Sequence, residues 1–313
     1  MEIKKGIVIR STGSACNILD SSGEVFECRL KGNFRIKGIS STNPVAVGDR
    51  VQFILQQGES VGLINAIEPR DNYIIRKATK LSKQSHIIAS NLSQAIIMVT
   101  LASPRTSTGF IDRFLVTAEA YHIPAMLIFN KIDLIMGDDL SRLQKLSDLY
   151  TGLGYECYKT SALENRGIEE VKSLLKDKIS LISGHSGVGK TALINSIEPG
   201  LLRKVGEISE AHHKGKHTTT FAEMLPLSFG GFIIDTPGIK EFGLVNFNKQ
   251  EIAERFPEMR QLMHKCLFNN CTHVHEPGCA VKAALAKGEI DQQRYVNYIS
   301  ILNDEYFEET EWD

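Results

Sequence analysis

The hydrophobic pattern predicts a multidomain protein, because it changes twice along the chain. Residues 3–67 read as short strands with apolar side chains at alternate positions. From about residue 92 strands alternate with helices, and after about residue 250 the pattern is helical around a cysteine-rich stretch. A chain of 313 residues can hold two or three domains. We expect a β-barrel over residues 1–68, an α/β domain over 69–250 and a small helical domain over 251–313.

The first domain is predicted from five short segments with the alternation of half-buried strands. Turn residues separate them, such as Ser-Ser-Gly at 21–23 and Val-Gly-Asp at 47–49. Five such strands are typical of a small barrel of the OB type or of the SH3-like type, and the pattern does not separate the two. Residues 67–91 read as a polar, basic connector that packs partly on the next domain. The expected strands are GIVIRS (6–11), ACNILD (15–20), VFECRL (25–30), RVQFIL (50–55) and GLINAI (62–67).

The middle of the chain predicts a mainly parallel sheet with helices between its strands. The expected strand segments, with the loops that end them, are QAIIMVT (94–100), PAMLIFNKIDL (124–134), YECYKTSA (155–162), KISLISG (178–184) and GFIIDTPG (231–238). The expected helices are FIDRFLVTAEAYH (110–122), LSRLQKLSDLYTGLG (140–154), GIEEVKSLLKD (167–177) and GKTALINSI (189–197). Two further helices, AVKAALAKGEI (280–290) and DQQRYVNYISILNDEY (291–306), are expected in the last domain.

Composition excludes some classes of protein. A formal net charge of −1 argues against a uniformly basic nucleic-acid binder, although residues 1–90 hold 13 Lys and Arg against 8 Asp and Glu. That local excess fits an RNA-facing side and an ordinary solvated face equally well. Apolar runs such as AIIMVTLA (95–102) are far shorter than the roughly 20 residues that cross a bilayer. The first residues lack the apolar core of a signal peptide, so we expect a cytoplasmic location.

The strongest motif is a phosphate loop, GxxxxGK[ST], between a predicted strand and a predicted helix. It runs from Gly184 to Thr191. Its glycines let successive backbone N–H groups point at phosphate oxygens, and the next helix adds its N-terminus. Lys190 is expected to neutralise the β- and γ-phosphates, and Thr191 to give a hydroxyl ligand to Mg²⁺. The other residues expected to line the phosphates are His185, Ser186, Gly187, Val188, Gly189 and Ala192.

Two loops predict recognition of guanine. NKID (130–133) ends an apolar strand, and a carboxylate at Asp133 can accept hydrogen bonds from N1–H and the N2 amino group of guanine, which adenine does not offer. Asn130 is expected to brace this loop, and the stem of Lys131 to lie against the base. Ser161 and Ala162 belong to TSA (160–162), which fits the companion loop where a backbone N–H meets guanine O6. Together the loops favour GTP over ATP.

A DxxG motif completes the set. DTPG (235–238) follows an apolar strand, so Asp235 is placed to hold Mg²⁺ and the Gly238 N–H to sense the γ-phosphate. The order of the motifs is base, base, phosphate, switch. That is the order expected if a GTPase domain had been cut open and rejoined elsewhere, so the sequence predicts circular permutation.

The segment HHKGKHTTT (212–220) lies where the first switch belongs. One of Thr218, Thr219 and Thr220 is expected to complete the Mg²⁺ shell; spacing does not decide which, and Thr219 is our candidate. Ile239 follows the DxxG glycine, where many small GTPases have a glutamine that orients the attacking water. Intrinsic hydrolysis is therefore expected to be slow. His217 is the candidate for orienting water, ahead of His212 and His213, and a solvated loop histidine is the alternative.

A cysteine cluster near the end predicts structural zinc. Cys266, Cys271, His273 and Cys279 lie within fourteen residues, CLFNNCTHVHEPGC. Three thiolates and one imidazole form a closed tetrahedral set without an open position for catalysis. His275 and His264 are possible substitutes for His273. The small domain around the cluster is expected to depend on the metal for folding.

With these motifs in place, the chain resembles the bacterial family of ribosome small subunit-dependent GTPases A (RsgA, also called YjeQ). The resemblance covers essentially the whole chain, through VGDRV (47–51), NKID, TSA, GHSGVGKTALIN, GKHTTT, DTPGIKEF and the Cys-Cys-His-Cys cluster. It implies an OB-fold barrel, a circularly permuted GTPase domain with GTP or GDP and Mg²⁺, and a helical domain with one Zn²⁺. The family's proposed catalytic histidine matches His217, and Thr191 stands where serine is frequent.

The resemblance also implies a role and a partner. We expect a cytoplasmic monomer that binds the 30S ribosomal subunit and its 16S rRNA late in maturation, with hydrolysis stimulated by the subunit and linked to release. Two alternatives remain open. In one, the protein is a binding module in which GTP only stabilises the docked shape, a possibility that Ile239 leaves standing. In the other, it serves the large subunit, against which the barrel and the zinc cluster argue.

Overall fold

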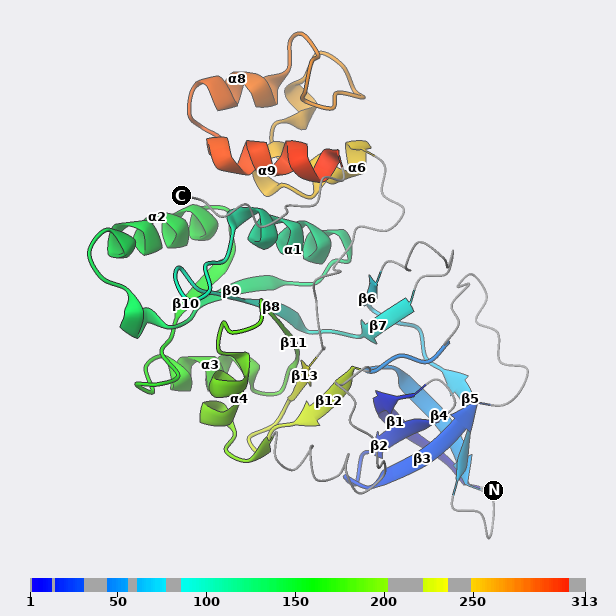
Figure 1. The fold of residues 1–313 in the computed structure, drawn as a ribbon. Coiled ribbons are helices and arrows are strands. Elements are labelled where there is room, and N and C mark those ends of the chain that lie inside the picture. Colours follow the sequence, from blue (N-terminus) through cyan, green and yellow to red (C-terminus); the bar gives the residue numbers. More distant parts are fainter. Residues whose placement is uncertain are drawn as a thin grey trace.

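A computed structural model describes residues 2–12, 15–30, 44–55, 61–76, 86–201, 222–235 and 249–303. In this part of the chain a barrel lies at one end, an α/β layer in the middle and a small group of helices at the other end (Figure 1). The expected architecture of barrel, central α/β domain and helical end with a Cys/His cluster is confirmed. No described helix is long and apolar enough to span a membrane.

The barrel is closed by five strands. β1 pairs with β2, β2 with β3, β3 with β5, and β5 with β4. The pairing of β4 with β1 closes the ring. The pairing of β3 with β5 is parallel, whereas the others are antiparallel. This strand order, β1-β2-β3-β5-β4-β1, decides for the OB type, which the hydrophobic pattern left open. The strands are β1 (Glu2–Ser11), β2 (Cys16–Asp20), β3 (Val25–Leu30), β4 (Arg50–Leu55) and β5 (Gly62–Ile67).

The Val-Gly-Asp turn fixes the barrel to the connector. Gly48 has a φ of +91°, and a Cβ there would lie 2.1 Å from the carbonyl oxygen of Ser90, so only glycine fits. The fully buried carboxylate of Asp49 accepts hydrogen bonds from Arg70 Nε (2.6 Å) and from Ser90 Oγ (2.6 Å). The described parts of the connector contain two strands that its polar sequence did not indicate, since β6 (Tyr73–Arg76) and β7 (His86–Ser90) form an antiparallel pair.

The central sheet has the order β10-β9-β8-β11-β13-β12 and is parallel except for β12. Every residue of β8 is buried, which explains its unbroken apolar run, since a central parallel strand is covered on both faces. β12 was not predicted; it also pairs with β1, so barrel and central sheet form one continuous sheet of 11 strands. The strands are β8 (Gln94–Val99), β9 (Ala125–Phe129), β10 (Glu156–Lys159), β11 (Ile179–Ser183), β12 (Glu223–Pro226) and β13 (Phe232–Asp235).

Helices cover both faces of this sheet (Figure 1). α1 (Thr108–Ala120) and α2 (Asp138–Gly152) pack on one face, where Phe114, Leu127 and Tyr150 belong to a common core. α3 (Ile168–Leu175) and α4 (Lys190–Ile197) pack on the other, where Val171 and Leu193 belong to a second core. A short 3₁₀ turn, η1 (Ile132–Leu134), follows β9. The four expected helices are confirmed within two residues at each end.

The C-terminal helices form a third core around Phe256 and Tyr298, whose rings meet edge to face 5.4 Å apart. Both expected helices exist; α8 is shorter than its sequence pattern, and residues 304–306 of the second expected helix lie outside the described part of the chain. α8 ends near Gly288, which has a φ of +75° and breaks the helix, and α9 begins at the residue after its N-cap, Asp291. The elements are α6 (Lys249–Glu254), α7 (Pro257–Arg260), η3 (Met263–Lys265), α8 (Ala280–Ala286) and α9 (Gln292–Leu302).

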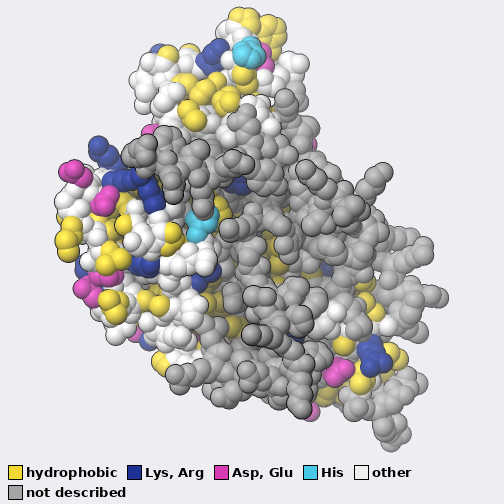
Figure 2. Space-filling view, viewed as in Figure 1, with side chains coloured by type: hydrophobic (Ala, Val, Ile, Leu, Met, Phe, Trp, Pro, Cys, Tyr) yellow, Lys and Arg dark blue, Asp and Glu magenta, His cyan; other side chains and the backbone are white. Residues whose placement is uncertain are grey.

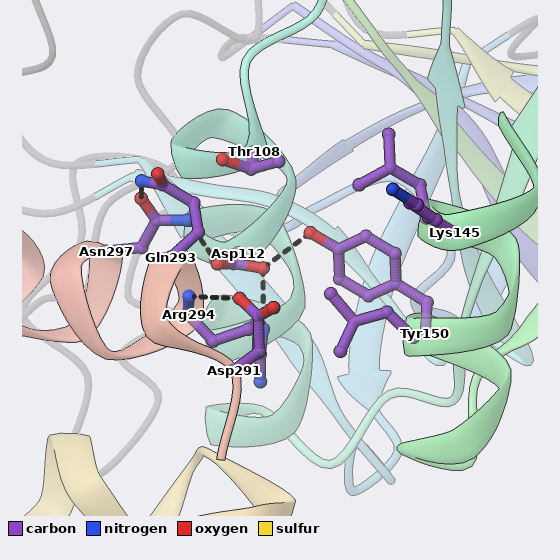
Figure 3. Close-up of a pocket in the computed structure, with 10 residues that line it drawn as sticks. Thr108, Asp112, Lys145, Tyr150, Asp291, Gln293, Arg294 and Asn297 are labelled. Atoms are coloured by element: carbon purple, nitrogen blue, oxygen red, sulfur yellow. Dashed lines mark hydrogen bonds and ion pairs between the residues drawn. The ribbon is translucent and has the colours of Figure 1, made fainter. Parts of the chain in front are cut away.

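A buried polar cluster joins these helices to the central domain. Asp112 of α1 accepts hydrogen bonds from Arg294 Nη1 (2.6 Å) and Asn297 Nδ2 of α9 and from the Tyr150 hydroxyl of α2 (2.8 Å), as Figure 3 shows. Arg294 also donates two hydrogen bonds to Glu258 of α7 (2.8 and 3.0 Å). Burial lowers the pKa of Arg294, but the neighbouring Asp112 and Glu258 carboxylates raise it by more than burial lowers it. The net pKa lies above the usual value for arginine, so the side chain stays charged.

Candidate functional site

The motif loops meet at one edge of the central sheet. β9, β10, β11 and β13 are parallel, so the loops that follow them leave from the same edge. NKID follows β9, TSA follows β10, the phosphate loop follows β11, and Asp235 is the last residue of β13. In open parallel sheets ligands bind at this edge, beyond the carboxyl ends of the strands. The permuted order of the motifs therefore does not separate them in space.

The phosphate loop curls around the ammonium group of Lys190. Lys190 Nζ donates hydrogen bonds to the carbonyl oxygens of Gly184 (2.6 Å) and His185 (2.8 Å). Gly189 has a φ of +97°, and a Cβ there would lie 2.4 Å from Asn130 Nδ2, so the loop can approach the NKID loop only with glycine at this position. Thr191 and Ala192 are exposed in the first turn of α4, and Ser186 is exposed within the loop.

Asn130 ties three loops together. Its side chain is 2% exposed. Nδ2 donates to the carbonyl oxygen of Val188 in the phosphate loop (2.8 Å), and Oδ1 accepts from Thr160 Oγ1 in the TSA loop (3.0 Å). The amide thus has both ends satisfied by the loops that the motifs predict to surround one ligand. Lys131 lies beside it in the left-handed region, with a φ of 61°.

The other predicted base-reading residues lie next to each other. Ser161 Oγ donates a hydrogen bond of 2.5 Å to Asp133 Oδ1. The carbonyl oxygen of Ala162 accepts from Ser196 Oγ of α4 (3.3 Å), which holds the TSA loop against the helix that follows the phosphate loop. The half-buried carboxylate of Asp133 keeps one oxygen that this hydrogen bond does not use.

Several predicted residues lie outside the described part of the chain. These are His217, Thr218, Thr219, Thr220, Gly238 and the alternatives His212 and His213. Asp235 is described only through its backbone, which pairs with Ile182 of β11, two residues before the phosphate loop begins.

One segment at this edge was not found from the sequence. The loop between β8 and α1 contributes the Ser103 carbonyl oxygen, which accepts a hydrogen bond from Lys131 Nζ. Pro104 lies against the phosphate loop, since a Cβ on Gly187 would be 3.3 Å from Pro104 Cδ. No local motif marks these residues. The available signal is their position after a buried strand that runs parallel to the strands of the motif loops.

The Cys/His residues come together at the other end of the molecule. The ligand atoms of Cys266, Cys271, His273 and Cys279 all lie within 4.8 Å of one another. His273 Nδ1 is 3.4 Å from Cys279 Sγ and 3.6 Å from Cys266 Sγ. A tetrahedral zinc ion with ordinary bond lengths separates a nitrogen and a sulfur ligand by roughly 3.6 Å. The donor set and its spacing therefore fit zinc, and the alternative ligands His264 and His275 are exposed outside the set.

The surroundings hold the cluster's backbone in place. The hydroxyl groups of Tyr295 and Tyr298 in α9 donate to the carbonyl oxygens of His273 (2.8 Å) and Thr272 (2.6 Å). Burial raises the pKa of Glu276, but hydrogen bonds from Thr272 and from backbone N–H groups outweigh it and lower the pKa to about 2. Hydrophobic side chains gather at the outer end of this domain (Figure 2). Leu267, in the segment between η3 and α8, is 69% exposed.

A hollow of about 220 Å³ lies elsewhere, between α1, α2 and α9 (Figure 3). Its floor is the Asp112–Arg294 cluster, and Lys145 and Thr108 line its rim. The polar groups of the floor already bind one another, so they offer little to a ligand. We regard it as part of the contact between the domains.

Comparison with known proteins identifies what this arrangement resembles. Residues 67–245 match the model of the RsgA GTPase family, and residues 5–64 match that of the RsgA N-terminal domain. The small ribosomal subunit biogenesis GTPase RsgA 2 of Bacteroides thetaiotaomicron is 54% identical over 300 residues, which cover 96% of each chain. A small ribosomal subunit biogenesis GTPase RsgA of Christiangramia forsetii is 52% identical over 303 residues, again covering 96% of each.

Solved structures agree. The crystal structure of YjeQ from Thermotoga maritima is 36% identical, with a TM-score of 0.79 over 97% of this chain and 99% of that one. The structure of YloQ, described as a circularly permuted GTPase, is 28% identical, with a TM-score of 0.73 over 97% of this chain and 95% of that one.

Proposed function

The chain belongs to the RsgA GTPase family and is a GTP-hydrolysing enzyme, and we propose that it acts in the biogenesis of the small ribosomal subunit. The relatives named above are small ribosomal subunit biogenesis GTPases. In this proposal the protein binds the 30S subunit and contacts its 16S rRNA, the subunit stimulates hydrolysis, and hydrolysis accompanies release. The protein acts as a monomer in the cytoplasm.

The hydrogen bond from Asn130 to Val188 carries the assignment of the nucleotide site. It couples the loop proposed to read guanine to the loop proposed to hold phosphates, at 2.8 Å. Lys190 would move its ammonium group from the carbonyl oxygens of Gly184 and His185 toward the β- and γ-phosphates. The unused carboxylate oxygen of Asp133 and the backbone of the TSA loop would meet the edge of guanine.

The remaining roles concern Mg²⁺, the γ-phosphate and the attacking water. Thr191, Asp235 and one switch threonine, with Thr219 as the candidate, would hold Mg²⁺, which supplies charge neutralisation at the phosphates. The Gly238 N–H would sense the γ-phosphate. His217 would orient the attacking water, because Ile239 has no polar group for that task. Slow intrinsic hydrolysis and dependence on a partner follow from that arrangement.

We assign zinc to the Cys/His cluster in a structural role. Three thiolates and the Nδ1 of His273 would close the tetrahedron. The ion would cross-link the loop before α8 to Cys279, the N-cap residue of α8. Four protein ligands would stabilise the fold of this domain and leave no coordination position for a substrate.

The site assignment is tested by nucleotide selectivity. Asp133→Asn replaces an acceptor pair by an amide, which can donate to O2 of xanthine. We expect affinity for GDP to fall at least ten-fold and affinity for XDP to rise, measured by isothermal titration calorimetry. Ser186→Ala, in the phosphate loop, serves as control and should leave the GDP-to-XDP ratio within two-fold. Unchanged selectivity in Asp133→Asn would remove the base-reading assignment.

Ile239 leaves open one second candidate, a binding module that uses GTP only to stabilise its docked shape. A variant that binds GTP but does not hydrolyse it separates the two. His217→Ala should bind the subunit and fail to leave it if hydrolysis drives release. Normal release by a variant without measurable hydrolysis would favour the binding module.

A further inference from the structure

Two residues outside the nucleotide motifs, Phe110 and Pro104, pack against the phosphate loop. The ring of Phe110, in the first turn of α1, stacks on the imidazole of His185 with centroids 3.9 Å apart and planes at 30°. Beside it, Pro104 lies against Gly187. The two contacts are made with His185 and Gly187, which occupy positions of the phosphate-loop motif that are not restricted to one residue type.

Hydrogen bonds hold the segment that carries Pro104 and Phe110 in place. The backbone N–H of Thr100, at the end of β8, donates to Thr106 Oγ1 (3.1 Å), and Thr100 Oγ1 donates to the carbonyl oxygen of Pro104 (2.5 Å). Ser107 caps α1 by accepting from the Phe110 N–H (3.2 Å). The neighbouring Ile111 is fully buried in the core. These contacts hold the backbone that carries Phe110, and its partly buried ring also packs against the central core.

His185 connects the ring contact to the charge that meets phosphate. Its carbonyl oxygen accepts from Lys190 Nζ (2.8 Å) and from the Val188 N–H (3.4 Å). A shift of His185 therefore moves an acceptor of the lysine and the curl of the loop together. A misplaced ammonium group or loop amide weakens phosphate binding, because both act through short, directional contacts.

From these contacts we propose that Phe110 is a positioning residue of the nucleotide site. Its flat ring holds the His185 peptide, and with it the curl of the phosphate loop, in the geometry that binds the β-phosphate. The inference rests on the proposed nucleotide site and extends it to an element, α1, that carries none of the motifs.

Two substitutions of Phe110 separate the effect of an aromatic ring that stacks on His185 from the effect of an apolar side chain in general. Phe110→Tyr keeps the ring and its stack on His185. Phe110→Leu keeps an apolar side chain but loses the stack. Val116→Ala is the control, because Val116 is a fully buried residue of the same helix that packs in the C-terminal core.

The measurement is the dissociation rate of a fluorescent GDP from the full chain, with folding checked by circular dichroism. Phe110→Leu should dissociate about three- to ten-fold faster, the range that aromatic pairs contribute beyond burial, while Phe110→Tyr stays within two-fold of the parent. Val116→Ala should keep the parental rate. The preference for GDP over XDP should be the same in all of them, since the base-reading loops are not moved.

Dissociation from Phe110→Leu at the parental rate would overturn the proposal, and so would equal acceleration in the leucine and tyrosine variants. A parent chain that binds no GDP would instead overturn the proposed nucleotide site, so the two failures are distinct. A helix-wide loss of stability is recognised by acceleration in Val116→Ala as well, which also counts against a specific role for the ring.

Discussion

Asn130 explains at the level of single atoms how loops far apart in the chain form one site. Its amide group has a donor and an acceptor, and each meets a different loop, at Val188 and Thr160. The buried amide leaves neither of these groups without a partner, which is the condition for burying it at low cost. Gly189 is the matching half of this contact, because any larger residue would collide with the amide nitrogen.

Gly189→Ala tests this contact. Gly154→Ala is a control with the same backbone demand, since Gly154 has a φ of +95°, against +97° at Gly189, but no atom lies within 4 Å of the position that its Cβ would take. Each substitution should cost about 1–2 kcal/mol of stability from the left-handed backbone, and Gly189→Ala should lose more because its Cβ collides with Asn130; urea unfolding measures both. Only Gly189→Ala should also lower GDP affinity, by ten-fold or more. Equal GDP affinity in both variants would contradict the coupling of the loops.

At the level of elements, the hydrophobic pattern was most informative where one element is long and buried on a regular face. β8 and the helices α1 and α2 appear at the predicted places for that reason. β12 and the β6–β7 pair were not predicted. β12 has only four residues and ends in Pro226, and β6 and β7 lie in a stretch that reads as a polar, basic connector. Motif spacing predicted the candidate site residues, whereas the contact of Phe110 with His185 has no local signal.

The Cys/His element provides a prediction about metal. Cys271→Ser should release the proposed zinc and unfold the C-terminal helices, because the ion would cross-link a small domain whose buried core includes two of its ligands, Cys271 and Cys279. Cys157→Ser is the control, since Cys157 is a half-buried thiol on β10, far from the cluster in the sequence. Metal content by mass spectrometry should fall from about one zinc per chain to near zero only in Cys271→Ser. A full zinc content in that variant would exclude Cys271 as a ligand.

At the level of the whole molecule, contacts between described residues join the three parts, and two of them stand out. β12 pairs with β1 and makes the barrel an extension of the central sheet. The buried Asp112–Arg294 pair attaches the Cys/His domain to α1. α1 therefore touches the phosphate loop at its first turn and the C-terminal helices along its length.

Removing one member of the buried pair should be costly. Arg294→Met leaves the Asp112 and Glu258 carboxylates without their cation and should destabilise the protein by about 3–5 kcal/mol. Adding Asp112→Asn removes the more deeply buried of the two stranded charges and should recover part of that loss. Urea unfolding of the two single variants and the double variant gives the coupling. Additive losses would show that the pair does not act as a unit.

The proposed role as a whole is tested most directly by GTP hydrolysis of the purified protein, measured alone, with 30S subunits and with 50S subunits at matched concentration. We expect slow hydrolysis by the protein alone and a rise of at least ten-fold with 30S subunits only, in line with the roughly 10³–10⁵-fold effects that a completing partner can have on GTPases. Stimulation by 50S subunits, or by neither subunit, would contradict a GTPase of small-subunit biogenesis.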